Sequence, residues 1–328
     1  MSIRLSVIFI TYNHEKYVEK ALRSVLTQET DFDFEVVVGE DCSTDRTREI
    51  LTAVAAEYPD KTVRLRFREE NSGRPTLNVY ETTKACQGEY LAYLEGDDYW
   101  SDPHKLQKQV DFLEAHPEYI ACTHDHVMID ENDERIRDPE TLKVGQLYEW
   151  SGLFTYEDYK YSGKWPGHYA SVVSRNIYPA EKYDYTILYR AHDFVDDALI
   201  LLFLLIQGDI FRMNEPMSAW RYVKKAGGKN WNSLAMERDL LRDDCYLSQT
   251  MMKWVDNAVG LSDYAKERAA KDFGSALKLW LKRPDRENYR FLKDMYDYNI
   301  KEVVCKGKRT SLLTYSLKTI FGKLFKAD

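Results

Sequence analysis

Residues 5–126 alternate short apolar runs rich in β-branched side chains with amphipathic patterns of helical period, and this alternation restricts the fold most strongly. The pattern predicts strands over residues 5–11, 34–39, 63–67, 89–94 and 119–126, separated by helices over residues 15–28, 46–58, 76–85 and 105–116. Such alternation is typical of βαβ crossovers, in which parallel strands pair and helices cover both faces of the sheet. We therefore expect an α/β fold with a doubly wound, mostly parallel sheet flanked by helices.

The regular pattern loosens after residue 130. The sequence there predicts a strand within residues 165–175, a strand over residues 217–223, a buried helix over residues 193–207 and a loop at Gly227-Gly228. Three further helices are predicted over residues 232–256, 262–281 and 284–298, and an amphipathic segment over residues 310–325 follows a basic run. These patterns predict an α/β domain of residues 1–230, a helical appendage of residues 231–305, and a basic amphipathic C-terminal helix of residues 306–328.

The overall charge argues against a general nucleic-acid binder, because a formal charge of −8 gives no positive field to attract a polyanion. The five cysteines are scattered without a Cys-x-x-Cys pair, which is typical of reduced thiols. The N-terminus enters a strand pattern without a signal-peptide core, and the longest apolar run, residues 198–206, is too short to span a bilayer. These features predict a cytoplasmic location.

Polar segments follow four of the predicted strands. In an open parallel sheet, ligands bind beyond the carboxyl ends of the strands, so segments 11–14, 40–45, 71–78 and 95–99 are expected to converge. In the last of these, an apolar strand runs directly into Glu95-Gly96-Asp97-Asp98. Carboxylates at this spacing can share one hard cation and leave coordination positions for phosphate oxygens.

The first two strands end in segments with two interpretations. Asn13 and Ser43 can act as helix caps. Alternatively, Tyr12 can stack on a base while Asp41 accepts a hydrogen bond from a ring N–H, which would select a nucleotide at this edge. The two interpretations are compatible.

Three segments together resemble the family 2 glycosyltransferases with a GT-A fold: Ser6-Val7-Ile8 through Thr11-Tyr12-Asn13, then Glu40-Asp41-Cys42-Ser43-Thr44-Asp45, then Leu94-Glu95-Gly96-Asp97-Asp98. The resemblance implies an inverting enzyme that uses a nucleotide sugar, with a UDP sugar favoured, and a divalent metal, Mg²⁺ or Mn²⁺. The last family motif is usually Asp-x-Asp-Asp, so Glu95 is a departure. The metal is assigned to Asp97 and Asp98. The residues implied for the nucleotide and donor are Thr11, Tyr12, Asn13, Glu40, Asp41, Arg74, Glu95, Asp97 and Arg221.

Such enzymes need a general base that takes the proton of the acceptor hydroxyl. The family places it at the start of an apolar helix, and the matching residue is Asp197, with Asp196 as the alternate. A carboxylate there can also simply stabilise the helix dipole. His168 is a candidate contact to the acceptor. In the family's aromatic-Arg-x-His segment, Val223 replaces the histidine after Arg221.

The resemblance implies a saccharide or lipid-linked saccharide acceptor and a role in bacterial surface polysaccharide synthesis. The C-terminal segment 310–325 either packs on the protein or lies on an anionic membrane, which would make the protein peripheral on the inner face of the cytoplasmic membrane. His124 and His126 suggest a zinc site only weakly, because no third ligand is nearby. Two alternatives remain: a non-catalytic nucleotide-sugar-binding protein, and a nucleotidyltransferase, although Thr11-Tyr12-Asn13-His14 lacks the glycine-rich loop that such an enzyme needs.

Overall fold

The chain forms two compact units, which divide between Asn232 and Ser233. The structure is a computed structural model, and it describes residues 3–145, 152–162, 165–195, 197–225, 231–236, 238–260 and 262–304. The predicted three-part division stays a prediction, and its third part, together with the Gly227-Gly228 loop, lies outside the described residues. Within these ranges, no helix combines the length and the apolar character required to cross a bilayer.

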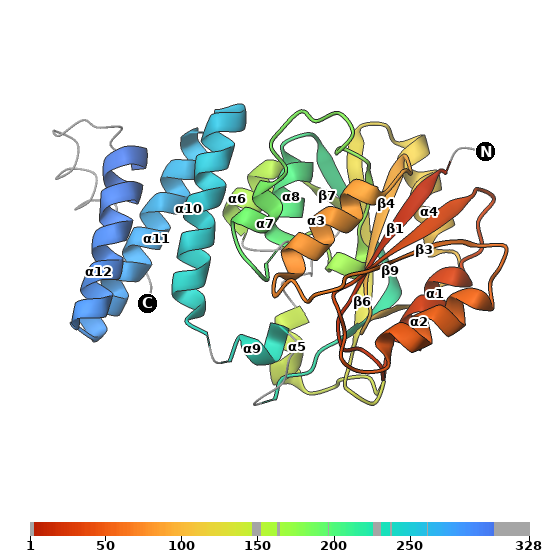
Figure 1. The fold of residues 1–328 in the computed structure, drawn as a ribbon. Helices are drawn as coiled ribbons and strands as arrows, with labels where there is room; N and C mark the ends of the chain where they lie inside the picture. The colour runs from red at the N-terminus through yellow and green to blue at the C-terminus, as the bar shows by residue number, and fades with distance from the viewer. Residues whose placement is uncertain are drawn as a thin grey trace. The chain divides into compact units, whose positions relative to one another are not determined.

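A mixed sheet forms the centre of the first unit (Figure 1). Its strand order is β3-β2-β1-β4-β8-β6-β9-β5, and β7 pairs with β9. The pairs β1 with β2, β1 with β4, β2 with β3 and β6 with β9 are parallel, whereas β5, β7 and β8 pair antiparallel. The strands are β1 (Leu5–Thr11), β2 (Phe34–Glu40), β3 (Thr62–Phe67), β4 (Tyr90–Glu95), β5 (Tyr99–Trp100), β6 (Tyr119–Ile129), β7 (Gly152–Phe154), β8 (Val173–Arg175) and β9 (Asp209–Arg221).

Helices cover both faces of this sheet, because β1, β2 and most of β4 are buried on both sides. The odd-numbered apolar residues of β1 pack with apolar residues of α1, α2 and α4 in one core cluster. On the opposite face, Gly39 of β2 lies against α3, and Tyr93 of β4 lies against α8. The helices of this unit are α1 (Val18–Leu26), α2 (Thr47–Ala56), α3 (Pro75–Ala85), α4 (Lys105–Ala115), α5 (Pro139–Gly145), α6 (Tyr156–Ser162), α7 (Ile187–Arg190) and α8 (Asp197–Leu205), followed by α9 (Trp231–Leu234) at the boundary.

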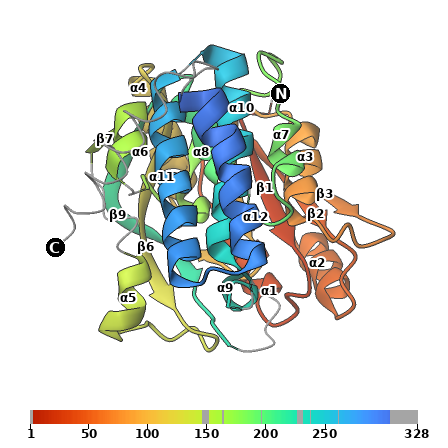
Figure 2. The same cartoon turned by 90° about the vertical axis from the view of Figure 1, so that its left-hand side faces the viewer.

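The second unit is helical. It contains α10 (Leu240–Val259), α11 (Ser262–Lys282), α12 (Arg286–Met295) and a π-helix (Tyr296–Val304), and Figure 2 shows α11 and α12 side by side. Asp239 and Asp285 cap α10 and α12 by accepting hydrogen bonds from backbone N–H groups three residues later. Gly260 ends α10 in the left-handed conformation, with φ of 68°. The core of this unit contains Cys245, Phe273, Ala276, Phe291, Met295 and Ile300.

The predicted elements of residues 5–126 are all present, with ends shifted by a few residues. The strand predicted within residues 165–175 is present as β8, after a 3₁₀ turn at Tyr169–Ser171 in which Ser171 N–H and Oγ–H both donate to the His168 carbonyl. One prediction further along the chain is wrong. The helix predicted over residues 232–256 is two helices, α9 and α10.

Candidate active site

Loops from three parallel strands emerge side by side at the carboxyl edge of the sheet. Ile10 of β1 pairs with Glu95 of β4, and Thr11 pairs with Glu40 of β2, so all three strands end at the same level. The loop after β3 joins them, because the Asn71 side chain donates to the Asp41 carbonyl at 2.6 Å. The four polar segments therefore converge as predicted.

The acidic cluster begins at the last residue of β4. Gly96 is required by space, because a Cβ atom there would lie 2.5 Å from Thr11 Oγ1 and 2.9 Å from His14 Nδ1. The Glu95 side chain is exposed, that of Asp97 is 19% exposed, and Asp98 is only 2% exposed. The turn thus presents Asp97 to solvent and draws Asp98 inside.

The two carboxylate oxygens of Asp98 differ in their hydrogen bonding. Oδ1 accepts a hydrogen bond from the Arg221 backbone N–H at 2.7 Å, whereas buried Oδ2 has no hydrogen-bond partner in the described part of the chain. His168 Nδ1 lies 3.8 Å from Oδ2. Burial raises the pKa of Asp98 well above its usual value, and the negative charge of Asp97 raises it further. A cation beside these carboxylates would relieve both effects.

Arg221, at the end of β9, holds the acidic turn in place. Its Nε donates to the Asp97 carbonyl at 2.8 Å, and its Nη1 donates to the Asp130 carbonyl at 2.6 Å. The guanidinium also pairs with Asp133 and lies 4.0 Å from the centre of the Tyr17 ring. Since Arg221 is 3% exposed, its contacts in this structure are with the protein rather than with solvent.

The loop after β1 is joined to the loop after β2. Asn13 has a positive φ of 56°, its N–H donates to Ser43 Oγ at 2.8 Å, and its Oδ1 accepts from the Thr44 N–H at 2.8 Å. The helix-cap interpretation of Asn13 and Ser43 is therefore wrong, because α1 and α2 begin further on, with Tyr17 and Arg46 at their N-cap positions. Tyr12 is partly exposed next to this junction.

The two acidic residues after β2 are engaged by the protein. Buried Glu40 accepts from the Ser43 N–H at 2.5 Å and pairs with Arg48. Buried Asp41 accepts from Ser72 N–H at 3.0 Å and from Ser72 Oγ at 2.7 Å. These bonds fix the shape of the loop after β2, and direct contact of either carboxylate with a nucleotide stays a prediction.

Arg74 is the N-cap residue of α3, and its side chain reaches the segment before α8. Its Nε donates to Asp193 Oδ1 at 2.7 Å, and its Nη2 donates to the Tyr189 carbonyl. These contacts connect Arg74 to the region of the predicted base. A contact of Arg74 with phosphate also stays a prediction.

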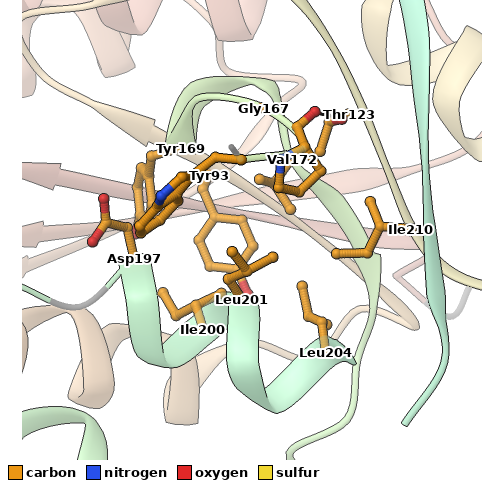
Figure 3. Close-up of a pocket in the computed structure, with 12 residues that line it drawn as sticks. Tyr93, Thr123, Gly167, Tyr169, Val172, Asp197, Ile200, Leu201, Leu204 and Ile210 are labelled. Carbon is orange, nitrogen blue, oxygen red and sulfur yellow. Dashed lines mark hydrogen bonds between the residues drawn. The ribbon is translucent and has the colours of Figure 1, made fainter. Parts of the chain in front are cut away.

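Asp197 is the first residue of α8, whose following residues to Leu205 are all buried. Its Oδ1 accepts from the Ala198 N–H at 2.7 Å, and burial raises the pKa of its carboxyl group. Asp197 also lies at one end of a cavity of about 30 Å³, with its carboxyl group directed away from Ile200, Leu204 and Ile210 (Figure 3). A cavity of this size holds one water molecule. The alternate base, Asp196, lies outside the described residues.

The turn 167–169 links Asp197 to the acidic cluster. Gly167 and Tyr169 line the same cavity as Asp197, and the Tyr169 ring lies 5.0 Å from that of Tyr93 on β4. Between them, His168 stacks on Trp220 at 4.7 Å, and burial lowers the pKa of its imidazole well below the usual value. His168 is thus enclosed beside Asp98, and its contact with an acceptor stays a prediction.

His14 belongs to the site, although the sequence analysis did not select it. Its Nε2 lies 4.0 Å from Asp97 Oδ2, and its Nδ1 lies 3.2 Å from Thr11 Oγ1. Its place directly after Asn13, in the loop of the first strand, is the signal that could have identified it. For His124 and His126, the described residues contain no group of three His, Cys, Asp or Glu side chains that could hold a metal.

Comparison with known proteins gives a consistent result. The family model described as Glycosyl transferase family 2 matches residues 6–174. An uncharacterised protein of Mycobacterium tuberculosis is 44% identical over 120 residues, covering 37% of this chain and 34% of that protein. The putative teichuronic acid biosynthesis glycosyltransferase TuaG of Bacillus subtilis is 38% identical over 109 residues, covering 33% and 41%. The poly(ribitol-phosphate) beta-N-acetylglucosaminyltransferase TarS of Staphylococcus aureus is 36% identical over 117 residues, covering 35% and 19%.

These matches span well under two thirds of the relatives' own lengths. The crystal structure of S. aureus TarS 1–349 in complex with UDP-GlcNAc superimposes with a TM-score of 0.65 at 17% identity, covering 92% of this chain and 82% of that one. The likeness confirms the predicted GT-A architecture with C-terminal helices.

Proposed function

Because the chain belongs to glycosyl transferase family 2, we propose that it transfers a sugar from a nucleotide diphosphate sugar to a hydroxyl acceptor by an inverting displacement. The names of TuaG and TarS support a role in bacterial surface polysaccharide synthesis, and the UDP-GlcNAc complex of TarS supports a UDP sugar as the donor. The acceptor is a saccharide or lipid-linked saccharide. A cytoplasmic site of action, with membrane contact through residues 306–328, belongs to the same proposal.

The observation that carries the proposal is the buried Asp98 Oδ2, which has no hydrogen-bond partner in the described part of the chain. With the partly exposed carboxylate of Asp97 beside it, the donor set fits Mg²⁺ or Mn²⁺, which proteins often hold with one or two carboxylates together with substrate phosphates. The remaining ligands would come from the diphosphate and water. When bound, the ion would neutralise charge on the leaving diphosphate.

The residues around this pair have supporting roles. Arg221 fixes the backbone of the acidic turn, and His14 lies at the open side of Asp97. The joined loops at Asn13 and Asp41 shape the place for the nucleoside, where partly exposed Tyr12 can stack on the base. Glu95 stands where the family usually has an aspartate, and its exposed side chain at the end of β4 is proposed to contact the donor.

Asp197 is the proposed general base. Its raised pKa makes the carboxylate a better proton acceptor than an ordinary aspartate, which suits removal of the hydroxyl proton as the oxygen attacks the anomeric carbon. Asp197 lines a cavity together with Gly167 and Tyr169, whereas His168, between these two residues, lies beside Asp98. This arrangement separates the group that deprotonates the acceptor from the groups that hold the leaving diphosphate.

The test of the base is Asp197→Asn. We expect transfer to fall by about 10²- to 10⁴-fold, because a positioned base contributes a factor of this order, while the affinity for UDP stays unchanged. Turnover is measured with a panel of labelled nucleotide sugars, and the control is Asp184→Asn, which removes an exposed carboxylate paired with Arg190. Undiminished transfer by Asp197→Asn would refute the assignment. If the wild type turns over no donor in the panel, the non-catalytic alternative replaces the proposal.

A further inference from the structure

A second, larger cleft lies beside β6 and β9. Its volume is about 730 Å³, which is within the range of ligand pockets, about 300–1,000 Å³. Polar residues of β6, β9 and the turn after β6 line it, together with α5: Asp125, His126, Arg135, Arg137, Arg212 and Asn214. None of the donor and base roles proposed above uses this cleft.

The cleft is a positively charged region in an acidic chain. Arg135 and Arg137 are exposed, and within the described ranges neither has a carboxylate partner. Two nearby carboxylates are already engaged: Asp133 pairs with Arg221 and Lys20, and Asp138 accepts from the Thr141 N–H at 2.8 Å. The guanidinium groups of Arg135 and Arg137 can therefore pair with an anionic ligand.

The interior of the cleft adds a third guanidinium. Arg212 is buried, and its Nη2 donates to Asp125 Oδ1 at 2.8 Å. Burial lowers the pKa of His126 to about 4, so this imidazole is neutral at ordinary pH. The three arginines and Asp125 thus give the lining a net positive charge, whereas the whole chain has a charge of −8. The planar guanidinium group of arginine can donate two parallel hydrogen bonds to the oxygens of a phosphate or a carboxylate.

This cleft shares a wall with the acidic cluster. The His126 ring, which lines the cleft, lies 5.6 Å from the ring of His168, and His168 Nδ1 lies 3.8 Å from Asp98 Oδ2. The turn that bears Arg135 is attached at the same place, because Arg221 donates to the Asp130 carbonyl and Asp133. An oligomeric acceptor bound in the cleft could therefore extend one end to the proposed donor site.

We propose that this cleft binds an anionic group of the acceptor, a phosphate or a carboxylate that the acceptor bears near the hydroxyl that reacts. The proposal rests on the proposed function, since it assigns the acceptor of the same reaction. The donor diphosphate is proposed to bind at Asp97 and Asp98, beyond His168 and Arg221, so Arg135 and Arg137 of the cleft can bind a second anion. The acceptor class is then an acidic saccharide or polyol phosphate rather than a neutral glycan.

The test measures binding of three oligomers by isothermal titration calorimetry at low salt: a hexamer of glycerol phosphate, hexagalacturonate, and neutral maltohexaose. We expect at least one anionic hexamer to bind at least about tenfold more tightly than maltohexaose, as expected for charge-assisted hydrogen bonds. The one that binds more tightly identifies phosphate or carboxylate as the group. Affinity for the anionic hexamers no greater than for maltohexaose would overturn the proposal.

The variant Arg135→Ala/Arg137→Ala should weaken binding of the preferred hexamer about 10- to 100-fold, on the scale of two lost charge-assisted contacts. The matched control, Arg283→Ala/Arg286→Ala, removes the same charge from exposed positions in the helical unit and should leave the affinity unchanged. An equal loss in both variants, or competition by UDP for the hexamer, would contradict the assignment. UDP binding to the wild type in the presence of Mg²⁺ tests the donor proposal separately.

Discussion

Arg221 shows how one buried residue can determine the shape of a site through its contacts with the protein. Its backbone N–H and its guanidinium together hold Asp98, the Asp97 carbonyl and the turn at Asp130. A hydrogen bond to a charged group contributes about 1.5–3 kcal/mol, so several of them strongly restrict the acidic turn. Arg221 therefore positions the acidic turn in this structure.

Lys105 is buried at the start of α4, and no hydrogen-bond partner for its Nζ is present in the described part of the chain. Its ammonium lies 4.2 Å from the centre of the Trp100 ring, and burial lowers its pKa to about 7. We expect Lys105→Met to raise the free energy of unfolding at pH 7 by about 1–3 kcal/mol, because an unpaired buried cation is replaced by an apolar side chain of similar length.

The gain should depend on pH in a defined direction. Above pH 7 the folded protein releases the Lys105 proton while the unfolded chain keeps it up to about pH 10.5, so wild-type stability rises with pH over this window. Urea unfolding of both proteins between pH 7 and pH 9.5 should show the advantage of Lys105→Met becoming smaller. An advantage that grows with pH would contradict this description of Lys105.

A substitution of Gly96 tests how closely the acidic turn packs against Thr11 at the end of β1. A Cβ atom at this position would lie 2.5 Å from Thr11 Oγ1, so Gly96→Ala must displace either the turn or the loop after β1. We expect a loss of about 1–3 kcal/mol of stability and weaker UDP binding. The control is Gly274→Ala in α11, where no atom lies within 4 Å of the added Cβ and helix propensity favours alanine by about 1 kcal/mol. Equal thermal shifts for the two variants would rule out the predicted crowding.

At the scale of elements, the parallel strands and their helices could be predicted, because strands buried on both faces are continuous apolar runs bounded by polar loops. The convergence of the polar segments at the carboxyl edge followed from that topology. The short elements α5, α6, α7, β5 and β7 were not predicted, since segments of a few residues have little periodicity of their own. The partners of Asp41, Arg74 and Arg221 come from distant segments, which no local pattern indicates.

Helix α11 contains a buried carboxyl group that should make the stability of the second unit depend on pH. Asp272 is 2% exposed, its Oδ1 lies 3.2 Å from Arg268 Nε, and burial raises its pKa to about 6. A raised carboxyl pKa favours folding below about pH 4, and this contribution is lost as the pH rises through about 6. Asp272→Asn removes the titration and should gain about 1–3 kcal/mol relative to wild type between pH 4 and pH 7.

Amide hydrogen exchange measures the opening of α11 separately from the first unit. The matched control is Asp256→Asn, an exposed position on α10, which should give the same difference from wild type at both pH values. A relative stability of Asp272→Asn that falls between pH 4 and pH 7 would show that the Arg268 pair outweighs the burial of Asp272.

At the scale of the whole molecule, the family 2 match and the TarS-like fold describe a GT-A glycosyltransferase chain with C-terminal helices. The fold alone allows many donors and acceptors, because function depends on the site rather than on the architecture. The sequence indicated that the polar segments and the acidic cluster meet at the carboxyl edge of the sheet. It could not indicate the arginine cleft beside β6, since Arg135, Arg137 and Arg212 come together only through the pairing of β6 with β9.

The central claim is that Asp97 and Asp98 hold a divalent ion together with a nucleotide diphosphate. Calorimetric titration of UDP into the wild type with Mg²⁺ or Mn²⁺, into the wild type with EDTA, and into Asp97→Asn tests it most directly, with Asp60→Asn as an exposed control. The claim predicts binding that requires the metal and is weakened at least about tenfold by Asp97→Asn, a loss of about 1.4 kcal/mol or more. Equal affinity with EDTA and with metal, unchanged in Asp97→Asn, would contradict it.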